Sequence, residues 1–320
     1  MKKVLIVDTI HPVFEEQLSA NEFIFTDGTK LSKAEVENVI DDFNGVVIRS
    51  RFKLDSDFLA KAKNLQFIAR AGAGMENIDV EFAESRGIVC INAPEANRNA
   101  VGEHALAMLL ALFNKLFIAD AEVRNGVWKR EENRGIELNG KKIGIIGFGN
   151  MGSAFAEVLR GFDMELLAYD KYIKIDKTRF PYVRQVELYD IYINADVISL
   201  HVPLTKETTY FVDDTFLNNR KKNIFIINTA RGRVLHTEAL VDALKSGKVL
   251  GACLDVIEYE GTSFEQLVTD QLPSAWQYLT KSDKVVLSPH IAGWSFESHR
   301  KISEVMAFKV LELYSRQLKK

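Results

Sequence analysis

The stretch that decides the fold of this chain runs from Lys142 to Asp170 and reads KIGIIGFGNMGSAFAEVLRGFDMELLAYD. The run Ile143 to Ile146 is short, apolar and β-branched, which predicts a buried parallel strand. It leads into Gly147-Phe148-Gly149-Asn150-Met151-Gly152 and a helical pattern, and a second apolar run, 166 to 169, ends at Asp170. This order of strand, glycine turn, helix, strand and acid predicts a βαβ unit with the dinucleotide-binding fingerprint.

The glycines and the acid of this unit suit a dinucleotide for separate physical reasons. Gly147 permits a tight turn, Gly149 lets a pyrophosphate approach the backbone, and Gly152 lets helix and strand pack closely. Free N–H groups and the positive end of the helix dipole would face the anion. Asp170 would accept hydrogen bonds from ribose hydroxyls and repel a 2′-phosphate, so we expect NAD rather than NADP. A glycine triplet by itself also occurs in ordinary βα turns, and the surrounding pattern favours the functional interpretation.

Composition limits the classes of protein to be considered. The 320 residues suffice for two domains, and a net charge of −3 with mixed acids and bases gives no indication of nucleic acid or of an acidic membrane surface as a partner. The two cysteines, Cys90 and Cys253, lie in apolar runs and are expected to be buried thiols in a reducing compartment. No signal peptide, membrane span or metal site is predicted, so we expect a cytoplasmic protein.

Short apolar runs alternate with helical patterns on both sides of the fingerprint. Before it, strands are predicted at 4–7, 46–49, 66–69 and 88–91, with no glycine fingerprint among them. After it, strands are predicted at 197–200, 224–227, 249–254 and 285–287. A long apolar helix over 99–119 is expected at an interface between domains or subunits, and the amphipathic segment 298–320 is expected to pack back on the first domain.

Polar residues follow the later strands, where ligands of open parallel sheets bind. Arg231 follows one of these strands and could hold a carboxylate through two parallel hydrogen bonds, although a lone arginine is more often a salt bridge or a helix cap. His290 follows the last strand and titrates in the useful pH range, although a single histidine is more often structural. Glu260 could fix the tautomer of that imidazole, although a loop glutamate is usually only solvated.

The motifs GFGNMG, AYD, LHVPLT, NTARG, GACLDV and SPHIAGW, in this order, resemble those of the D-isomer-specific 2-hydroxy acid dehydrogenase family over essentially the whole chain. The resemblance implies two doubly wound parallel-sheet α/β domains, a Rossmann NAD-binding domain at 97–290 inserted into a flavodoxin-like substrate domain at 1–96 plus 291–320. It also implies an active site in the cleft between the domains. Arg231, Glu260 and His290 fall on the catalytic Arg-Glu-His set of the family. The expected cofactor residues are Gly147, Gly149, Asn150, Met151, Gly152, Asp170, His201, Val202, Pro203, Thr208, Thr229, Ala230, Asp255, Ala292 and Gly293.

The glutamate position departs from the family pattern. Family members usually follow the glutamate with proline and reach the histidine sooner, whereas here Gly261 follows Glu260 and the segment Thr262 to Asp283 is longer than usual. Glu258 is therefore an alternative partner for His290, and we favour Glu260 because its spacing from Arg231 and Asp255 is similar to that in the family. Formate dehydrogenases of the same superfamily carry glutamine at this position, so Glu260 argues against that activity.

Arginines of the first domain bear on the substrate. Arg49-Ser50-Arg51 and Arg70, which precedes Ala71-Gly72-Ala73-Gly74, would bring three guanidinium groups near the cleft, and a phosphorylated substrate would explain them. The pattern resembles 3-phosphoglycerate dehydrogenases of serine biosynthesis without their C-terminal regulatory domain, and backbone N–H groups of Gly72, Ala73 and Gly74 are expected to help Arg231 hold the substrate carboxylate. Each arginine could instead pair with a surface acid.

Other readings of the same pattern stay open. The alternatives are a hydroxypyruvate or glyoxylate reductase, a D-lactate-type dehydrogenase, or an NAD(H)-sensing binding protein like the corepressors that resemble this family. The apolar helix after Ala100 and the region of Trp128 predict a homodimer.

Overall fold

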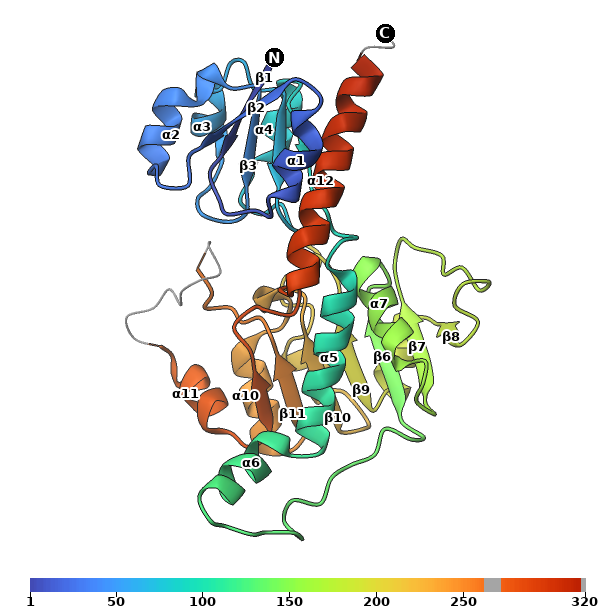
Figure 1. The fold of residues 1–320 in the computed structure, drawn as a ribbon. Coiled ribbons are helices and arrows are strands. Elements are labelled where there is room, and N and C mark those ends of the chain that lie inside the picture. The colour runs from blue at the N-terminus through green and yellow to red at the C-terminus, as the bar shows by residue number, and fades with distance from the viewer. Residues whose placement is uncertain (262–271, 318–320) are drawn as a thin grey trace. The chain divides into compact units, whose positions relative to one another are not determined.

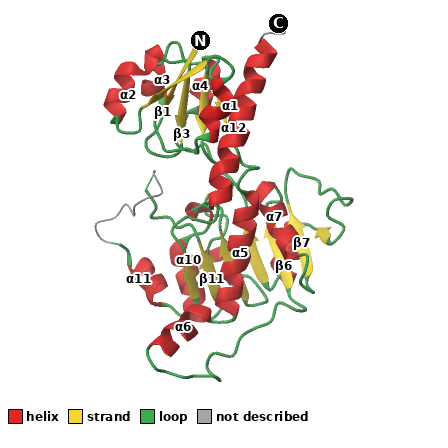
Figure 2. Cartoon of the chain, viewed as in Figure 1, coloured by secondary structure: helices red, strands yellow, loops and turns green. Residues whose placement is uncertain are grey.

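The computed structural model describes residues 1–261 and 272–317, and within them the chain forms two compact units. Residues 1–97 and 294–317 belong to the first unit, and 98–260 and 272–293 to the second. Figure 2 shows helices on both sides of the strands in each unit. None of the helices in these ranges is both long and apolar enough to span a bilayer.

The first unit contains a five-stranded parallel sheet in the order β2-β1-β3-β4-β5, the order of flavodoxin-like folds. Its elements are β1 (Lys2–Ile6), α1 (Val13–Ser19), β2 (Phe23–Asp27), α2 (Lys33–Val39), η1 (Ile40–Asp42), β3 (Gly45–Ile48), α3 (Ser56–Lys61), β4 (Phe67–Arg70), α4 (Val80–Ser85), β5 (Val89–Ile91) and α12 (Phe296–Gln317).

The C-terminal helix α12 completes the core of this first unit, as expected from its amphipathic pattern. Met306, Ala307 and Val310 are fully buried against residues of β1, β3 and β4. Figure 1 shows α12 beside α1, at opposite ends of the sequence. The first unit is therefore made from both ends of the chain.

The second unit contains a seven-stranded parallel sheet in the order β12-β11-β10-β9-β6-β7-β8. Strand order reverses between β6 and β9, which is where doubly wound sheets bind dinucleotides. Its elements are α5 (Arg98–Phe113), α6 (Leu116–Arg124), β6 (Lys142–Ile146), α7 (Asn150–Leu159), β7 (Glu165–Tyr169), β8 (Val183–Gln185), α8 (Leu188–Asn194), β9 (Val197–Leu200), α9 (Asp214–Asn218), β10 (Ile224–Asn228), η2 (Gly232–Val234), α10 (Thr237–Ser246), β11 (Val249–Leu254), α11 (Ser274–Lys281) and β12 (Val285–Leu287).

Helix α5 crosses α7 at close range in this unit. A side chain at Gly102 would place its Cβ 2.9 Å from the Ala154 carbonyl, so only glycine permits this approach. Because α7 follows the glycine turn directly, the packing of α5 fixes the end of α7 that faces the candidate site.

Three expectations from sequence are corrected by the structure. The single helix predicted over 99–119 is two helices, α5 and α6, because Lys115 has a left-handed conformation with φ of 51°. Cys253 is buried as expected, but Cys90 is only half-buried. Strands β2 and β8 were not predicted.

Candidate active site

The glycine turn after β6 has the geometry expected of an anion-binding turn. Gly147 has a φ of 90°, which favours glycine. Gly149 is the N-cap of α7, and apart from its two chain neighbours no atom of residues 1–261 and 272–317 lies within 4 Å of the position that a Cβ there would occupy. Gly152 faces the opposite way, since its Cβ would lie 2.0 Å from the Gly147 carbonyl oxygen. One face of the turn is thus open and the other is tightly packed.

Asp170 lies beside this turn at the end of β7. Its Oδ2 accepts a hydrogen bond from the Phe148 N–H at 2.7 Å, and its Oδ1 accepts from the N–H groups of Tyr172 and Ile173 at 2.9 and 2.8 Å. Because each carboxylate oxygen has two lone-pair directions, these contacts leave capacity to accept from a ligand hydroxyl. The Asp170 carboxylate therefore stabilises the glycine turn and can still accept a hydrogen bond from a ligand beside it.

Strand β9 ends at His201-Val202-Pro203, and the His201 ring turns into the protein. Its Nε2 lies 2.8 Å from the Ser199 hydroxyl, and the ring packs against Phe155 at 5.5 Å between centroids. Burial lowers the pKa of His201 to about 3, so its imidazole is neutral at physiological pH. The side chain assigned from sequence to the cofactor is packed inside the unit, which leaves the backbone of 201–203 as the group at the sheet edge.

The loop after β9 is closed by Thr208. Its hydroxyl donates to the Pro203 carbonyl at 2.5 Å and accepts from the Thr205 N–H at 2.8 Å. Thr208, which we expected to bind the cofactor, therefore stabilises the loop that begins at Pro203.

Strand β10 leads to Thr229, Ala230 and Arg231, and Asn228 sets their backbone. The Asn228 side chain accepts from the Ala230 N–H and donates to the Arg231 carbonyl, both at 3.1 Å. A Cβ at Gly232 would lie 2.0 Å from the Ile257 carbonyl oxygen, so the residue after Arg231 has to be glycine. The buried Thr229 hydroxyl has no hydrogen-bond partner within residues 1–261 and 272–317, as expected of a group that serves a ligand.

Glu260 and His290 form the closest acid and imidazole pair of the site. Glu260 Oε2 lies 2.6 Å from His290 Nδ1, and both side chains are largely buried, with 14% and 23% exposed. The other glutamate oxygen accepts from the Ile257 N–H. Glu258, the alternative partner, instead accepts from the Thr237 N–H at 2.6 Å at the start of α10. The structure therefore brings Glu260, and not Glu258, to His290.

Asp255 holds the backbone of the segment that carries His290. Its carbonyl accepts from the His290 N–H at 2.8 Å, and its carboxylate accepts from the N–H groups of Ile291 and Ala292, each at 2.9 Å. His290 itself has a φ of 55°, a left-handed conformation that costs a non-glycine residue about 1 to 2 kcal/mol. We expected Asp255 to bind the cofactor. In the structure its carboxylate contacts the backbone of Ile291 and Ala292 instead.

In the first unit, the residues expected to bind substrate lie at the carboxyl edge of the sheet. The N–H groups of Arg49, Ser50 and Arg51 all contact Asp8 Oδ2, at 2.7, 3.0 and 3.2 Å. The Arg49 guanidinium lies over the Trp294 ring at 4.6 Å. Sequence reasoning missed Asp8 and Trp294, although Asp8 is the polar residue that follows the first apolar run.

The remaining arginines of this edge are held closely by the protein. Arg51 Nη1 donates to the carbonyls of Val7 and Gly28 at 3.1 and 3.3 Å. Arg70 is buried, and its Nη1 lies 1.9 Å from the position of a Cβ on Gly72, so the guanidinium needs glycine there. Ala73, between Gly72 and Gly74, accepts from the Asn92 side chain at 2.6 Å through its carbonyl.

Comparison with known proteins adds the family. Residues 106–292 match the model described as D-isomer specific 2-hydroxyacid dehydrogenase, NAD binding domain. The chain belongs to the D-isomer specific 2-hydroxyacid dehydrogenase family. The matched range contains the glycine turn, Arg231, Glu260 and His290, so the family assignment rests on the unit that carries the acid and imidazole pair.

Individual members of the D-isomer specific 2-hydroxyacid dehydrogenase family resemble nearly the whole chain. A D-3-phosphoglycerate dehydrogenase from Archaeoglobus fulgidus is 34% identical over 97% of this chain, which spans 57% of that relative. A hydroxypyruvate reductase from Thermotoga maritima is 34% identical, with 97% of each chain covered. The crystal structure of a D-lactate dehydrogenase from Aquifex aeolicus, complexed with NAD and lactic acid, is 28% identical with a TM-score of 0.83 over 99% of this chain and 96% of that one.

Proposed function

We propose that the chain is an NAD-dependent D-2-hydroxy acid dehydrogenase in which His290 and Glu260 move the substrate proton and Arg231 binds the substrate carboxylate. The observation that carries this proposal is the 2.6 Å contact between Glu260 Oε2 and His290 Nδ1, made at the same sheet edge as the glycine turn. We assign 97–290 to the cofactor and 1–96 plus 291–320 to the substrate.

The residues around the turn fit NAD. The open face at Gly149 and the N-terminus of α7 suit a pyrophosphate, and Asp170 presents acceptor capacity for ribose hydroxyls next to it. When bound, NAD supplies a nicotinamide ring that accepts or donates a hydride. The chain's own task is to place a substrate carbon near that ring and to handle the proton.

The contact with Glu260 supports a particular role for each ring nitrogen of His290. Because Nδ1 faces the carboxylate, we assign the contact with the substrate hydroxyl to Nε2. Glu260 then stabilises the imidazolium that forms when Nε2 takes the proton, much as a buried carboxylate orients histidine in hydrolases. Arg231 can fix the carboxylate so that the reacting carbon keeps one orientation.

For the substrate we propose 3-phospho-D-glycerate, oxidised to 3-phosphohydroxypyruvate in serine biosynthesis, with hydroxypyruvate, glyoxylate and D-lactate as alternatives. The presence of Arg49, Arg51 and Arg70 at one sheet edge supports a phosphorylated substrate, and relatives named D-3-phosphoglycerate dehydrogenase agree with it. The engagement of Arg51 with two backbone carbonyls lessens its share of this role.

A substrate panel with NAD and NADH tests this proposal. We expect turnover with 3-phosphoglycerate to exceed that with D-lactate, glycerate or glycolate, and Arg231→Ala to abolish turnover while NADH still binds by fluorescence. Turnover of unphosphorylated acids alone would refute the proposed substrate and favour one of the alternatives, hydroxypyruvate, glyoxylate or D-lactate. NADH binding without turnover of any 2-hydroxy or 2-oxo acid would favour the corepressor-like sensor.

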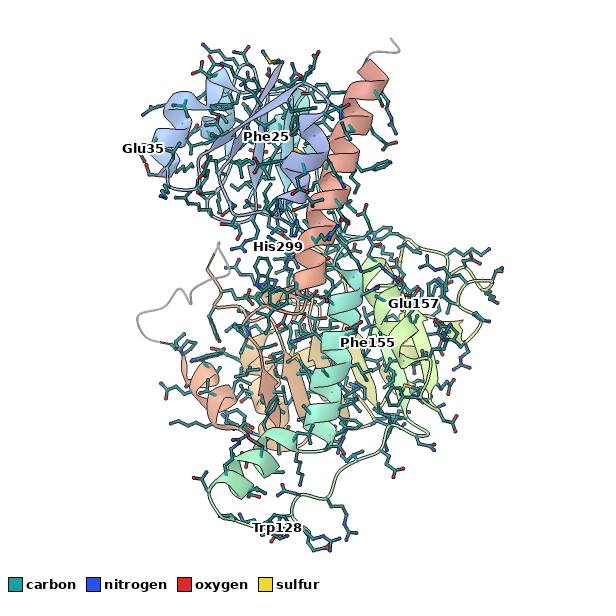
Figure 3. The ribbon with its side chains drawn as sticks, in the orientation of Figure 1. Phe25, Glu35, Trp128, Phe155, Glu157 and His299 are labelled. Atoms are coloured by element: carbon teal, nitrogen blue, oxygen red, sulfur yellow. The ribbon has the colours of Figure 1, made fainter. Side chains whose placement is uncertain are left out.

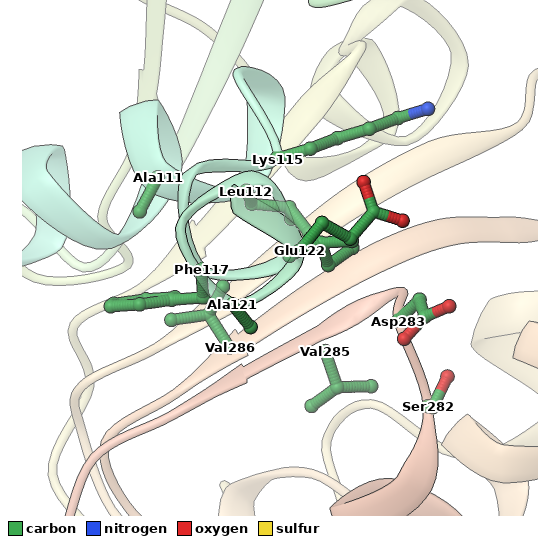
Figure 4. Close-up of a pocket in the computed structure, with 11 residues that line it drawn as sticks. Ala111, Leu112, Lys115, Phe117, Ala121, Glu122, Ser282, Asp283, Val285 and Val286 are labelled. Atoms are coloured by element: carbon green, nitrogen blue, oxygen red, sulfur yellow. The ribbon is translucent and has the colours of Figure 1, made fainter. Parts of the chain in front are cut away.

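We also propose a cytoplasmic homodimer that uses α6. The exposed apolar residues around this helix are Leu116, Phe117, Val123, Val127 and Trp128, and no residue of α6 is buried. Beside it lies a groove of about 440 Å³, shown in Figure 4, with an apolar floor and a polar rim. Its lining includes Leu112, Phe117, Ala121, Val285 and Val286 together with Lys115, Glu122, Ser282 and Asp283. Figure 3 shows Trp128 in the segment that follows α6. An isolated apolar patch of this kind marks an interface, and the free thiols fit a reducing compartment.

The dimer is tested by light scattering after chromatography. Phe117→Glu with Trp128→Ser should give a monomer, whereas Tyr172→Ser, which alters an exposed aromatic residue away from α6, should leave the mass unchanged. A monomeric parent chain would refute the proposal directly.

A further inference from the structure

His104, on the inner part of α5, contacts the segment that carries His290 although neither catalysis nor cofactor binding uses it. Its Nε2 lies 2.9 Å from the Ser288 hydroxyl and 3.5 Å from Asp255 Oδ1. The Ser288 hydroxyl in turn lies 2.6 Å from the same Asp255 oxygen. These three side chains connect a helix to the loop after β12 through one buried carboxylate.

The direction of the hydrogen bonds follows from the protons available. A carboxylate only accepts, and a serine hydroxyl has one proton, so Ser288 donates to Asp255 at the shorter distance. The Ser288 oxygen is then the acceptor for His104, which has to carry its proton on Nε2. The chain of donors runs from His104 to Ser288 to Asp255.

Asp255 is the point at which this chain meets the backbone of the His290 segment. The carboxylate also accepts from Ile291 and Ala292, and the Asp255 carbonyl accepts from His290. The side chain of Asp255 is only 1% exposed, so its partners within the protein replace water. The orientation of this carboxylate therefore fixes the positions of the Ile291 and Ala292 amides. These amides in turn hold the left-handed turn at His290.

We infer that His104 is a positioning residue for His290: by donating to Ser288 it fixes the Asp255 carboxylate and so the backbone of 288–292. This inference rests on the proposed role of His290 as the proton-transfer group. His104 needs no contact with substrate or cofactor. Its contribution is to keep the imidazole of His290 in the productive geometry, where a small displacement reduces turnover.

Substitutions at position 104 separate the donor from the bulk of the side chain. Gln can present an N–H near the position of Nε2, and Leu cannot. His104→Leu should lower kcat about tenfold with little change in KM, and His104→Gln should restore most of the loss. Met108→Leu is the matched control, because Met108 lies one turn along α5 and its sulfur contacts the same Ser288 hydroxyl at 3.6 Å without donating to it. Met108→Leu should keep wild-type kinetics.

Amide hydrogen exchange gives a readout that does not depend on turnover. In His104→Leu the amides of Ile291 and Ala292 should exchange about 2-fold to 10-fold faster, the range that loss of one hydrogen bond gives. The Gln variant should exchange like the wild type. Unchanged exchange in His104→Leu overturns the inference even if the protein is an active dehydrogenase, and faster exchange in a protein without dehydrogenase activity refutes only the proposed function.

A double variant tests whether the residues act as one chain. If His104 works through Ser288, Ser288→Ala should have a similar effect and the combined variant should lose no more than either alone. Losses that multiply in the double variant would show independent roles and overturn the inference.

Discussion

Glu258 and Glu260 are two residues apart and have different partners, which makes them a matched pair for testing the acid of the site. Glu260→Gln keeps the shape of the side chain and removes the charge beside His290 Nδ1. We expect kcat to fall about 100-fold or more with NADH affinity unchanged, because proton transfer by a positioned base typically contributes that much and His290 needs the Glu260 charge to act as that base. Steady-state kinetics and NADH fluorescence measure the two effects.

Glu258→Gln is the control for this substitution. It weakens the acceptor for the Thr237 N–H at the start of α10, so the melting temperature should fall slightly while kcat stays within about threefold of wild type. Equal loss of kcat in both variants would remove the basis for assigning the role to Glu260.

The buried imidazole of His201 should make the free energy of unfolding depend on pH in the acidic range. Burial lowers its pKa from 6.5 to about 3. As the pH falls from 6.5 toward 3, the unfolded chain takes up a proton that the folded chain refuses, so the free energy of unfolding decreases; above 6.5 neither state is charged here and the effect vanishes. His201→Gln should therefore flatten the decline of stability between pH 6.5 and 4 in urea titrations. An identical decline in both proteins would contradict the burial of this ring.

Sequence identified where the site lies better than it identified what each side chain does. The position of Arg231 and His290 at one sheet edge was predictable because polar residues that follow parallel strands collect there, whereas the catalytic roles proposed for them and for Glu260 come from the family resemblance. The direction of a side chain at that edge depends on partners distant in sequence. The His201 ring points inward because it contacts the Ser199 hydroxyl and the Phe155 ring. The Asp255 carboxylate points toward the 288–292 segment because the N–H groups of Ile291 and Ala292 donate to it. No local pattern encodes these choices.

At the scale of elements, the break between α5 and α6 is a strained point. Lys115 has a φ of 51°, and no glycine or proline announces the break, which is why the sequence predicted one long helix. The strands that sequence missed are also explained by position: β2 and β8 lie at the sheet edges, and β2 is mostly exposed, so neither shows a buried apolar run. Central strands were found because both their faces are covered.

Lys115→Gly should leave the second unit more stable than Lys115→Ala does. Glycine adopts the left-handed conformation without the cost of a Cβ, which we expect to raise the free energy of unfolding by about 1 kcal/mol relative to Lys115→Ala. The alanine variant is the proper reference, because it too lacks the contact of the lysine Nζ with the Glu132 carbonyl. Equal unfolding midpoints for the two variants would show that the break carries no strain.

At the scale of the molecule, each unit has its own buried core, and α12 gives a means of perturbing only one of them. Met306 is fully buried in the first unit, whereas Phe308 on the same helix is 60% exposed. Met306→Asp buries a charge and should cost more than 4 kcal/mol, roughly the upper end for single substitutions, while Phe308→Asp should stay within about 0.5 kcal/mol. Circular dichroism measures the loss of structure.

The second unit should still bind the cofactor when the first unit is destabilised by Met306→Asp. Because the glycine turn and Asp170 lie in the second unit, Met306→Asp should still bind NADH. Loss of NADH binding in Met306→Asp, with normal binding in Phe308→Asp, would show that the two units do not fold independently.

The position of α12 has a consequence for the order in which a newly made chain can fold. Helix α12 covers residues of β1, β3 and β4, yet it is synthesised after the whole second unit. The intervening stretch of about 200 residues takes roughly 10 to 40 s at typical synthesis rates of about 5 to 20 residues per second. During that interval the apolar face that will receive Met306, Ala307 and Val310 is uncovered on the ribosome. We expect the N-terminal sheet to be the part of the nascent chain that chaperones protect, and the second unit, although later in sequence, to finish folding first.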